Sequence, residues 1–376
     1  MRRRDFLRQG ALGMAVAVST PAVTAESESK KPKRVEFRTL GRTGLKVTTV
    51  SFGAMRISHS ALMFRALDLG INYIDTARVY TGGNNERLVG EVLKDHRNEV
   101  YVATKADPWR KTAKDVEQSL HTSLKELGTD CIDVYQIHDV ASAARLHNDD
   151  VKAFLSKAKE QGKIRFVGVS THNNMAEVVT AAAEDGFYDT VLTVYNFGNA
   201  ENKALAEALE KARKAQLGII AMKTQQGGYK LGEGEKGTPH QAALRWVLSN
   251  PAITCAIPGV TSYEMLEENV AVMGTKLGAA DLQDLRRYAE ATASVLCRFC
   301  GECTKTCKEH IQVCESLRCL MYAEGYNDLH LAREEYRRLR PFQRADACRL
   351  CSDCSARCVK GLHIQERMLV ADRILA

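Results

Sequence analysis

The sequence lacks several features that would place it in common protein classes. No apolar run reaches the roughly 20 residues that a membrane-spanning helix needs, so an integral membrane protein is not expected. No Gly-x-Gly-x-x-Gly opens a helix after a strand, which counts against an open dinucleotide-binding sheet. The formal charge is +7, but residues 1–34 hold eight Lys or Arg against three Asp or Glu, and no basic stripe with aromatics follows. A nucleic-acid partner is therefore not expected.

What the chain does have is cysteine arranged in a repeated pattern. Eight of its 12 cysteines form two copies of C-x2-C-x2-C-x3-C: Cys297, Cys300, Cys303 and Cys307, then Cys348, Cys351, Cys354 and Cys358. This spacing is typical of cubane iron–sulfur clusters in bacterial ferredoxins. Zinc is an alternative, although its thiolates usually come as two CxxC pairs separated by a longer loop. Disulfides are a second alternative, but cysteines crowded this closely pair only with strain. The pattern predicts two [4Fe–4S] clusters, although Lys308 and Val359 replace the proline that commonly follows the fourth cysteine.

The pairing of cysteines with clusters can also be predicted. In two-cluster ferredoxins the fourth cysteine of each run binds the other cluster. We therefore expect Cys307 to join the second run and Cys358 to join the first. Of the other four cysteines, Cys131 and Cys255 are expected as buried apolar residues. Cys314 and Cys319 are expected to pack around the clusters, with a disulfide as the alternative.

The N-terminus is typical of an exported protein. Arg2-Arg3-Arg4-Asp5-Phe6-Leu7 resembles a twin-arginine signal, followed by a mildly apolar stretch and Val23-Thr24-Ala25, a small-residue cleavage site. A disordered basic N-terminus is the alternative. We predict a signal peptide over residues 1–25, a polar linker over 26–34 and a periplasmic location. The route carries folded proteins, which suits a chain that must acquire its clusters before export.

Short apolar runs alternate with amphipathic stretches after the linker. The strand-like runs are Val47–Phe52, Asn72–Asp75, Val100–Thr104, Ile132–Ile137, Ile164–Val169, Val191–Tyr195, Gly218–Met222 and Ile253–Ile257. Eight strands with helices between them predict an α/β fold, a (β/α)8 TIM barrel over residues 35–293. Residues 294–376 are then a small, α-rich, ferredoxin-like iron–sulfur domain, with a charged helix over Ala332–Arg340 that stops at Pro341.

Polar residues stand where the predicted strands end, which is where barrels carry their function. Asp75 ends the second strand, Lys105 follows the third and His138 follows the fourth, while Tyr80 comes five residues after Asp75. A phenol beside an ammonium and a carboxylate can act as a proton donor near neutral pH.

Residues 37–270 resemble the aldo/keto reductases. The resemblance is carried by FRTLGRTGLKVTTVSFG from Phe37, GINYIDTARVYTGGNNERLVGEVL from Gly70, ATK at 103–105, GKIRFVGVS at 162–170, ALRWVLSNP at 243–251 and IPGVTSYEMLEENV at 257–270. It implies that Tyr80 is the general acid toward a small carbonyl or alcohol substrate, and that Lys105 lowers the phenol pKa. It also implies that Asp75 holds the lysine and that His138 orients the carbonyl.

The resemblance implies a nicotinamide cofactor as well. Ser170 and Asn173 stand at the positions that contact the nicotinamide, and Glu268 and Asn269 at those that contact adenine. Leu192 replaces the usual glutamine, and Gly259, Val260 and Met265 replace the residues that read a 2′-phosphate. With no cation in those places, NAD(P)H use is expected to favour NAD(H) over NADP(H).

The sequence therefore predicts an exported aldo/keto-reductase-type enzyme whose electrons are relayed by two [4Fe–4S] clusters, with a redox partner protein. The alternative is an electron-transfer protein whose barrel has lost nicotinamide-dependent catalysis and serves as a binding scaffold. Lys223 and His172 either face the substrate pocket or are structural. The substrate itself depends on loops whose shapes no pattern fixes.

Overall fold

A computed structural model describes residues 34–108, 112–229 and 239–376. The predicted signal peptide and all but the last residue of the predicted linker lie outside the described residues. Within the described ranges, no helix is both long enough and apolar enough to cross a membrane.

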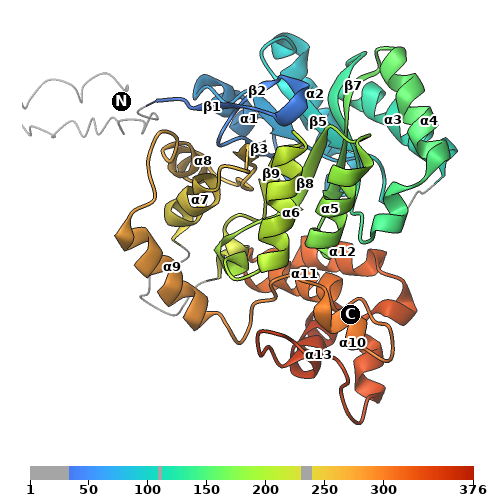
Figure 1. Cartoon of the computed structure of the whole chain (residues 1–376), viewed down its shortest axis with the longest axis vertical. Coiled ribbons are helices and arrows are strands. Elements are labelled where there is room, and N and C mark those ends of the chain that lie inside the picture. Colours follow the sequence, from blue (N-terminus) through green and yellow to red (C-terminus); the bar gives the residue numbers. More distant parts are fainter. Residues whose placement is uncertain (1–33, 109–111, 230–238) are drawn as a thin grey trace, which may run out of the picture.

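Eight parallel strands form the core of the molecule (Figure 1). They are β3 (Phe52–Gly53), β4 (Tyr73–Asp75), β5 (Tyr101–Lys105), β6 (Ile132–Ile137), β7 (Ile164–Thr171), β8 (Thr190–Val194), β9 (Gly218–Met222) and β10 (Cys255–Ala256). Each strand pairs with the next in sequence, and bridges from Val50 to Ala256 and from Gly53 to Gly259 join the first strand to the last. The α/β fold class with an eight-stranded parallel sheet is therefore confirmed, as expected for a (β/α)8 fold.

Helices cover the outside of the sheet. They are α1 (Ala61–Asp68), α2 (Asn85–His96), α3 (Ala113–Leu127), α4 (Asp149–Glu160), α5 (Met175–Asp185), α6 (Lys203–Lys214), α7 (His240–Ser249), α8 (Tyr263–Val270) and α9 (Ala279–Ala291). Helix α3 shows why they form. Thr112 and Asp115 make a reciprocal capping box at its start, and Gly128 ends it in the left-handed conformation. Between these ends Val116 and Leu120 lie on its buried face, which packs the helix onto the barrel.

The first predicted strand is shorter than expected. The apolar run Val47–Phe52 is divided, because Val47 pairs across a hairpin with Arg38 instead of joining the barrel. That hairpin consists of β1 (Phe37–Thr39) and β2 (Lys46–Thr48), and it is the N-terminal hairpin that the family resemblance implies. Only Phe52–Gly53 then enters the barrel sheet, beside Ile74 and Asp75.

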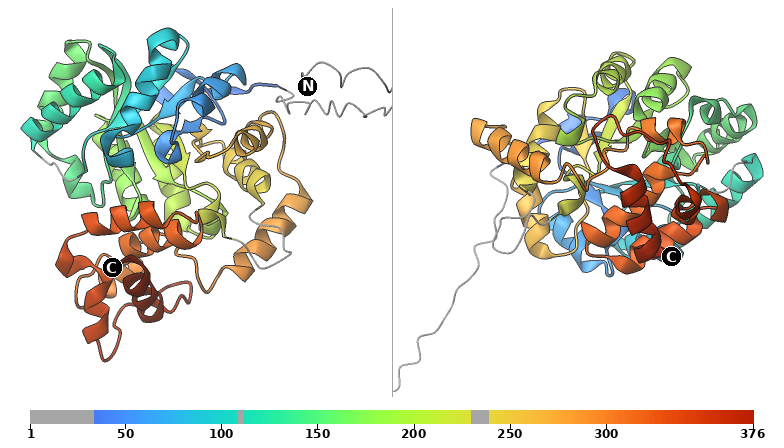
Figure 2. Two further views of the ribbon diagram at one scale, coloured as in Figure 1. Left: turned by 180° about the vertical axis from the view of Figure 1, so that it is seen from behind. Right: turned by 90° about the horizontal axis from the view of Figure 1, so that it is seen from below.

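The chain beyond the barrel forms a helical segment against one end of it. Its helices are α10 (Glu302–Thr306), α11 (Val313–Glu324), α12 (Leu329–Arg338) and α13 (Ile364–Leu375), and α12 ends just before Pro341 as predicted. We call residues 294–376 the C-terminal segment. Figures 1 and 2 show it below the strands, with α11 and α12 next to the barrel. Contacts with Val79, Asn173 and Lys223, which follow three different strands, place it over the carboxyl ends of the strands. Active sites of this fold occur at that end.

Candidate active site

Three of the predicted catalytic residues form a connected group at the carboxyl ends of β4 and β5. The Lys105 ammonium donates to the Asp75 carboxylate, to the Thr76 carbonyl at 2.6 Å and to the Tyr80 hydroxyl at 3.2 Å. Gln136, on the neighbouring strand β6, donates to the second carboxylate oxygen of Asp75 at 3.0 Å. Asp75 and Lys105 are both buried. The group is therefore fixed in place by rigid strands, with the phenol as its outermost member.

The charges around Tyr80 leave its phenol protonated. Burial raises the pKa of Tyr80, and the Asp75 carboxylate raises it further. Burial likewise raises the pKa of Asp75 and lowers the pKa of Lys105, and their ion pair opposes both shifts. The family resemblance implies that Lys105 lowers the phenol pKa, whereas the net shift of the Tyr80 pKa is upward, first because the phenol is buried and then because Asp75 is near. A phenol that keeps its proton can serve as a general acid.

His138 follows β6 and lies edge-on to Tyr80, with ring centroids 6.1 Å apart. Burial and the nearby Lys105 ammonium lower the pKa of His138 well below its usual value, so the ring is neutral at pH 7. Its Nδ1 is buried and has no hydrogen-bond partner among the described residues. A neutral imidazole beside the phenol matches the predicted role of orienting a carbonyl.

On one side of Tyr80 the barrel opens into a cavity of about 250 Å³. We call it the cofactor-side cavity. Asp75 and Tyr80 form its inner wall, and β3, β9 and the loop after β10 form much of the rest. Leu192, Gly259 and Met265, three of the four residues that depart from the family pattern, line it. The cavity is thus where the resemblance places the nicotinamide cofactor.

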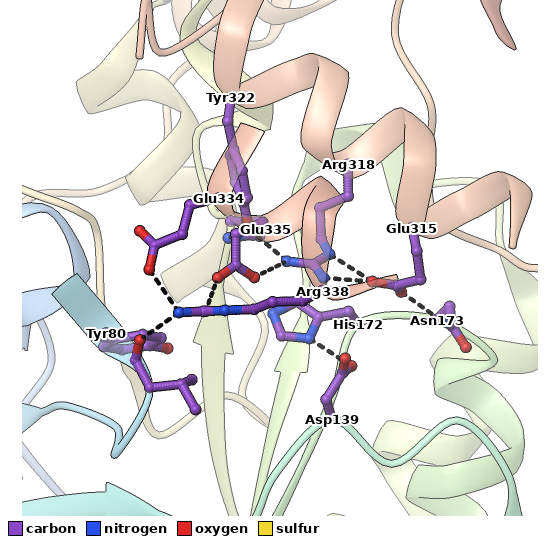
Figure 3. Close-up of polar contacts among 12 residues, drawn as sticks. Tyr80, Asp139, His172, Asn173, Glu315, Arg318, Tyr322, Glu334, Glu335 and Arg338 are labelled. Atoms are coloured by element: carbon purple, nitrogen blue, oxygen red, sulfur yellow. Dashed lines mark hydrogen bonds and ion pairs between the residues drawn. The ribbon is translucent and has the colours of Figure 1, made fainter. Parts of the chain in front are cut away.

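On the other side of Tyr80 the space is nearly filled. The hollow between Tyr80, His138 and His172 measures only about 20 Å³. Helices α11 and α12 of the C-terminal segment close it with Arg318, Tyr322, Glu335 and Arg338. Figure 3 shows these side chains reaching toward Tyr80 and Asp139. We call this space the substrate-side hollow; it is large enough for about one water molecule.

The network that closes this hollow is built around a buried guanidinium. Arg318 donates to Glu315 at 2.9 Å and to the Tyr322 hydroxyl at 2.8 Å, and it lies 3.6 Å from Glu335. Next to it, His172 pairs with Asp139 at 2.8 Å. His172 therefore faces the pocket, one of the two alternatives that the sequence left open.

The four residues predicted to contact nicotinamide and adenine have different surroundings. Ser170 is buried on β7, where its hydroxyl accepts a hydrogen bond from the Asp139 amide at 3.0 Å. The Asn173 amide donates to Glu315 of the C-terminal segment at 2.7 Å. The Asn269 Oδ1 accepts a hydrogen bond from Gln225 at 2.8 Å, and its Nδ2 is buried without a partner among the described residues. Glu268, the preceding residue, is exposed. Of the four, only Glu268 is exposed.

The eight patterned cysteines gather around two hollows in the C-terminal segment. Cys297, Cys300, Cys303 and Cys358 line one of them, and Cys307, Cys348, Cys351 and Cys354 line the other. Each hollow thus takes three cysteines from one run and the fourth from the other, which is the exchange expected from the spacing. Cys314, from α11, also lines the first hollow.

All twelve cysteines are free thiols in the structure. Cys255 and Cys319 are buried, whereas Cys131 is partly exposed. In the described ranges no group of three or more His, Cys, Asp or Glu side chains is arranged to hold a metal ion. A cubane places each thiolate on a different iron, so its four sulfurs lie farther apart than around one ion.

Several site residues were not found from the sequence. Arg56 lines the cofactor-side cavity, and Arg318 and Tyr322 close the substrate-side hollow. Arg318 and Tyr322 are four residues apart on α11 and so share a face. That spacing is the one signal that links them, and it does not reveal which face meets the barrel.

A parallel barrel with buried aspartate, lysine and histidine and a tyrosine at its mouth defines a class of barrel oxidoreductases. The model of the aldo/keto reductase family matches residues 52–237 and 228–290. The chain belongs to the aldo/keto reductase family and is an oxidoreductase. The C-terminal segment lies beyond the matched residues.

Individual relatives agree with this assignment. The chain is 28% identical to L-galactose dehydrogenase of Arabidopsis thaliana, over 64% of this chain and 88% of that protein. It is 27% identical to methylglyoxal reductase YeaE of Escherichia coli, over 61% of this chain and 84% of that protein. The holo form of aldo-keto reductase AKR11C1 from Bacillus halodurans has the same fold, with a TM-score of 0.58 and 24% identity, over 69% of this chain and 97% of that one.

Proposed function

We propose that this protein is an exported oxidoreductase that interconverts a small carbonyl compound and its alcohol, with electrons relayed by two [4Fe–4S] clusters. The observation that carries the catalytic part is the Asp75–Lys105–Tyr80 group on the inner wall of the cofactor-side cavity. The phenol is the proton donor, and His138 orients the carbonyl oxygen toward it.

The cofactor-side cavity fits a nicotinamide nucleotide. Members of the family typically use NAD(P)H, which when bound supplies a hydride to the carbonyl carbon. Gln225, which lines the cavity, donates to Asn269 at 2.8 Å, so one of the two positions implied to contact adenine adjoins the cavity wall. Gly259 and Met265 offer no cation at the positions that read a 2′-phosphate, which favours NAD(H) over NADP(H).

The cysteine hollows fit two clusters. Each presents the four patterned thiols, the donor set of a cubane cluster, which carries single electrons. Cys314 is a fifth cysteine at the first hollow and Tyr322 closes the substrate-side hollow, both on helix α11. Tyr322 comes eight positions after Cys314, which corresponds to about 12 Å at the rise of an α-helix. Helix α11 therefore connects the first cysteine hollow directly with the substrate-side hollow beside the catalytic group.

The twin-arginine pattern at residues 2–7 supports export to the periplasm, where free nicotinamide is scarce. A tightly held cofactor or a redox partner protein would then supply electrons. Fractionation of cells that produce the full chain tests the location. Mature protein in the periplasmic fraction that becomes cytoplasmic in the Arg3→Lys, Arg4→Lys double variant supports export, and an unchanged distribution contradicts it.

Tyr80→Phe tests the proposed acid. The change removes the hydroxyl but keeps the ring, so turnover of a panel of small aldehydes and ketones should fall by about 10²–10⁴-fold. Iron content should not change, because Tyr80 lines neither cysteine hollow. Turnover at the wild-type rate would show that another group donates the proton.

The alternative is an electron-transfer protein whose barrel is a binding scaffold. The filled substrate-side hollow and the use of Asn173 by Glu315 favour it. Titration of the anaerobically purified protein with NADH, followed by nicotinamide fluorescence, distinguishes the two functions. Saturable binding supports the reductase, and no binding at millimolar NADH supports the scaffold.

A further inference from the structure

The C-terminal segment carries the most exposed apolar side chains of the described protein. Among the described residues, Leu350 is 89% exposed, Phe342 67% and Val359 65%, more than any other large apolar side chain. Leu350 directly precedes Cys351 and Val359 directly follows Cys358, two of the patterned cysteines. A single exposed apolar residue is ordinary on a protein surface. Three of them within residues 342–359, beside cysteines, point to a surface that another molecule covers.

A group of arginines flanks Phe342 in the chain. Residues 337–346 hold four arginines and a single carboxylate, Asp346. Arg338 pairs with two glutamates of α12. The other three arginines form no ion pair with a carboxylate in the described part of the chain; they are Arg337, Arg340 and Arg344. We call these three residues, together with Phe342, the arginine patch. Its cations outnumber its one neighbouring carboxylate, so this surface is positively charged.

Contacts within the turn give the arginine patch a defined shape. The Arg344 guanidinium donates to the carbonyl of Arg337 and, at 2.9 Å, to the carbonyl of Leu339. It also lies 5.7 Å from the ring centroid of Tyr336, whose hydroxyl accepts from the Ala345 amide at 2.8 Å. The turn therefore folds back onto the end of α12 and brings Arg337 and Arg344 together. A surface that is ordered before binding loses less conformational entropy when a partner docks.

The arginine patch leads directly to the hollow lined by Cys307, Cys348, Cys351 and Cys354, which we call the second cysteine hollow. The 3₁₀ helix Ala345–Leu350 begins immediately after the patch and contains Cys348. Cys348 comes three positions after the start of this helix, which corresponds to about 6 Å at the rise of a 3₁₀-helix. Cys351 is partly exposed. A molecule bound to the patch would therefore lie beside this hollow.

The first cysteine hollow adjoins the barrel instead. Arg298, Cys300 and Lys360 line both that hollow and a groove of about 250 Å³, whose opposite wall is formed by the starts of α5 and α6. Among the described residues, the second cysteine hollow shares no lining residue with this groove, with the cofactor-side cavity or with the substrate-side hollow. The first hollow thus lies toward the barrel and the second toward the arginine patch, an order that suits electrons entering from outside.

We propose that the arginine patch is the docking surface for an acidic electron-carrier protein that delivers single electrons to the second cysteine hollow. The positive charge attracts an acidic surface. Phe342 and the neighbouring Leu350 supply apolar contact, and aromatic residues and arginine are enriched at protein interfaces. In each transfer the carrier is oxidised by one electron, which the cluster in that hollow accepts. The inference names the chemistry of the redox partner and rests on the proposed function for the cluster.

The test is calorimetric titration of the full-length, anaerobically purified protein with flavodoxin, an acidic one-electron carrier, and with cytochrome c, a basic one. Flavodoxin should bind, and its affinity should fall about tenfold or more when salt is raised to about 0.5 M. Arg340→Glu reverses one charge and should weaken binding about tenfold. Phe342→Ala removes an exposed ring and should weaken it about five- to fiftyfold. Both side chains are exposed, so unfolding of the variants should match the wild type.

Lys214→Glu is the matched control, because Lys214 is 72% exposed at the end of α6 and should have no effect on binding. Binding of flavodoxin but not of cytochrome c, with losses in both patch variants, supports the docking surface. Absence of flavodoxin binding at millimolar concentration, equal affinity for the two carriers, or patch variants that bind like the wild type would overturn it. Phosphatidylglycerol vesicles that bind where flavodoxin does not would also overturn it, since the patch would then serve a lipid surface. Because no turnover is involved, a protein that binds flavodoxin but reduces no carbonyl keeps the docking surface and loses the reductase.

Discussion

The two sides of Tyr80 differ sharply. The cofactor-side cavity measures about 250 Å³, whereas the substrate-side hollow measures about 20 Å³. The barrel loops surround much of the first, and the second is closed by helices α11 and α12. The segment that carries the cysteine runs therefore occupies the place where a substrate would approach the phenol. Its docking places the cysteine-bearing segment against the catalytic end of the barrel.

Charged side chains also differ between the two sides. On the substrate side, the buried Arg318 guanidinium is surrounded by Glu315, Glu335 and the Tyr322 hydroxyl. On the cofactor side, Arg56 and Lys223 are partly buried and have no carboxylate partner in the described structure. The first arrangement joins α11 to α12 within the C-terminal segment and reaches the barrel through the hydrogen bond from Asn173 to Glu315.

The largest effect on stability is expected from Arg318→Met. The change leaves the buried Glu315 carboxylate without its guanidinium, which should cost about 3–5 kcal/mol of unfolding free energy, whereas Glu335 keeps its ion pair with Arg338. The measurement is thermal and denaturant unfolding under anaerobic conditions. Arg213→Met is the matched control: Arg213 pairs with Glu210 on the surface, with side-chain exposures of 47% and 43%, so this variant should unfold close to the wild type. Equal losses in the two variants would mean that the network does not hold the segment.

Lys223→Met is expected to raise the free energy of unfolding, whereas Arg318→Met lowers it. The pKa of Lys223 is about 7 in the folded protein, against 10.5 as its ordinary value. Between these two pH values the unfolded chain holds more protons, so wild-type stability rises with pH across the window. The Met variant has no ammonium at this position, so its stability does not include the cost of burying that charge. It should be more stable than the wild type by roughly 2 kcal/mol below pH 7, with the difference shrinking toward pH 10. The charged groups nearest Lys223 are Arg318, Glu335, Glu315 and Arg56.

Unfolding at pH 6, 8 and 10 measures this difference. A Met variant that is less stable than the wild type at pH 6 would show that Lys223 is already paired in the folded protein.

The smallest effect is expected from Tyr322→Phe. Its hydroxyl accepts hydrogen bonds from Lys223 at 2.9 Å and from Arg318 at 2.8 Å, so it links the two sides. Its removal should cost about 1–3 kcal/mol. Tyr263→Phe, at a ring that is 45% exposed, is the control and should change stability by less than about 0.5 kcal/mol. No difference between these variants would mean that the two sides are not coupled through Tyr322.

Much of the barrel could be predicted from the sequence. The strands Ile132–Ile137 and Gly218–Met222 have the predicted bounds, and every residue in them is buried, as suits strands covered on both faces. Asp75, Lys105 and His138 could be placed because the carboxyl end of a barrel strand is a defined position. Val47 was assigned to the barrel because a hairpin strand and a barrel strand have the same local pattern.

The substrate-side network could not be predicted in this way. Arg338 donates to the Val79 carbonyl at 3.1 Å, and 259 positions separate these residues in the chain. Their meeting depends on how α11 and α12 dock on the barrel, and no local periodicity encodes that. The same holds for Arg56, whose guanidinium stacks 4.4 Å from the ring centroid of Tyr326. The surroundings of these charged side chains therefore depend on how the C-terminal segment packs against the barrel.

The proposed electron relay requires that the C-terminal segment hold two clusters with exchanged fourth cysteines. Iron, acid-labile sulfide and zinc should be measured in the anaerobically purified wild type and in Cys307→Ser. Two [4Fe–4S] clusters would give about eight irons and eight sulfides per chain in the wild type. In the variant we expect loss of the cluster held by Cys348, Cys351 and Cys354, with the other cluster intact. Zinc in place of iron, or loss of the cluster held by Cys297, Cys300 and Cys303 instead, would contradict the proposed relay.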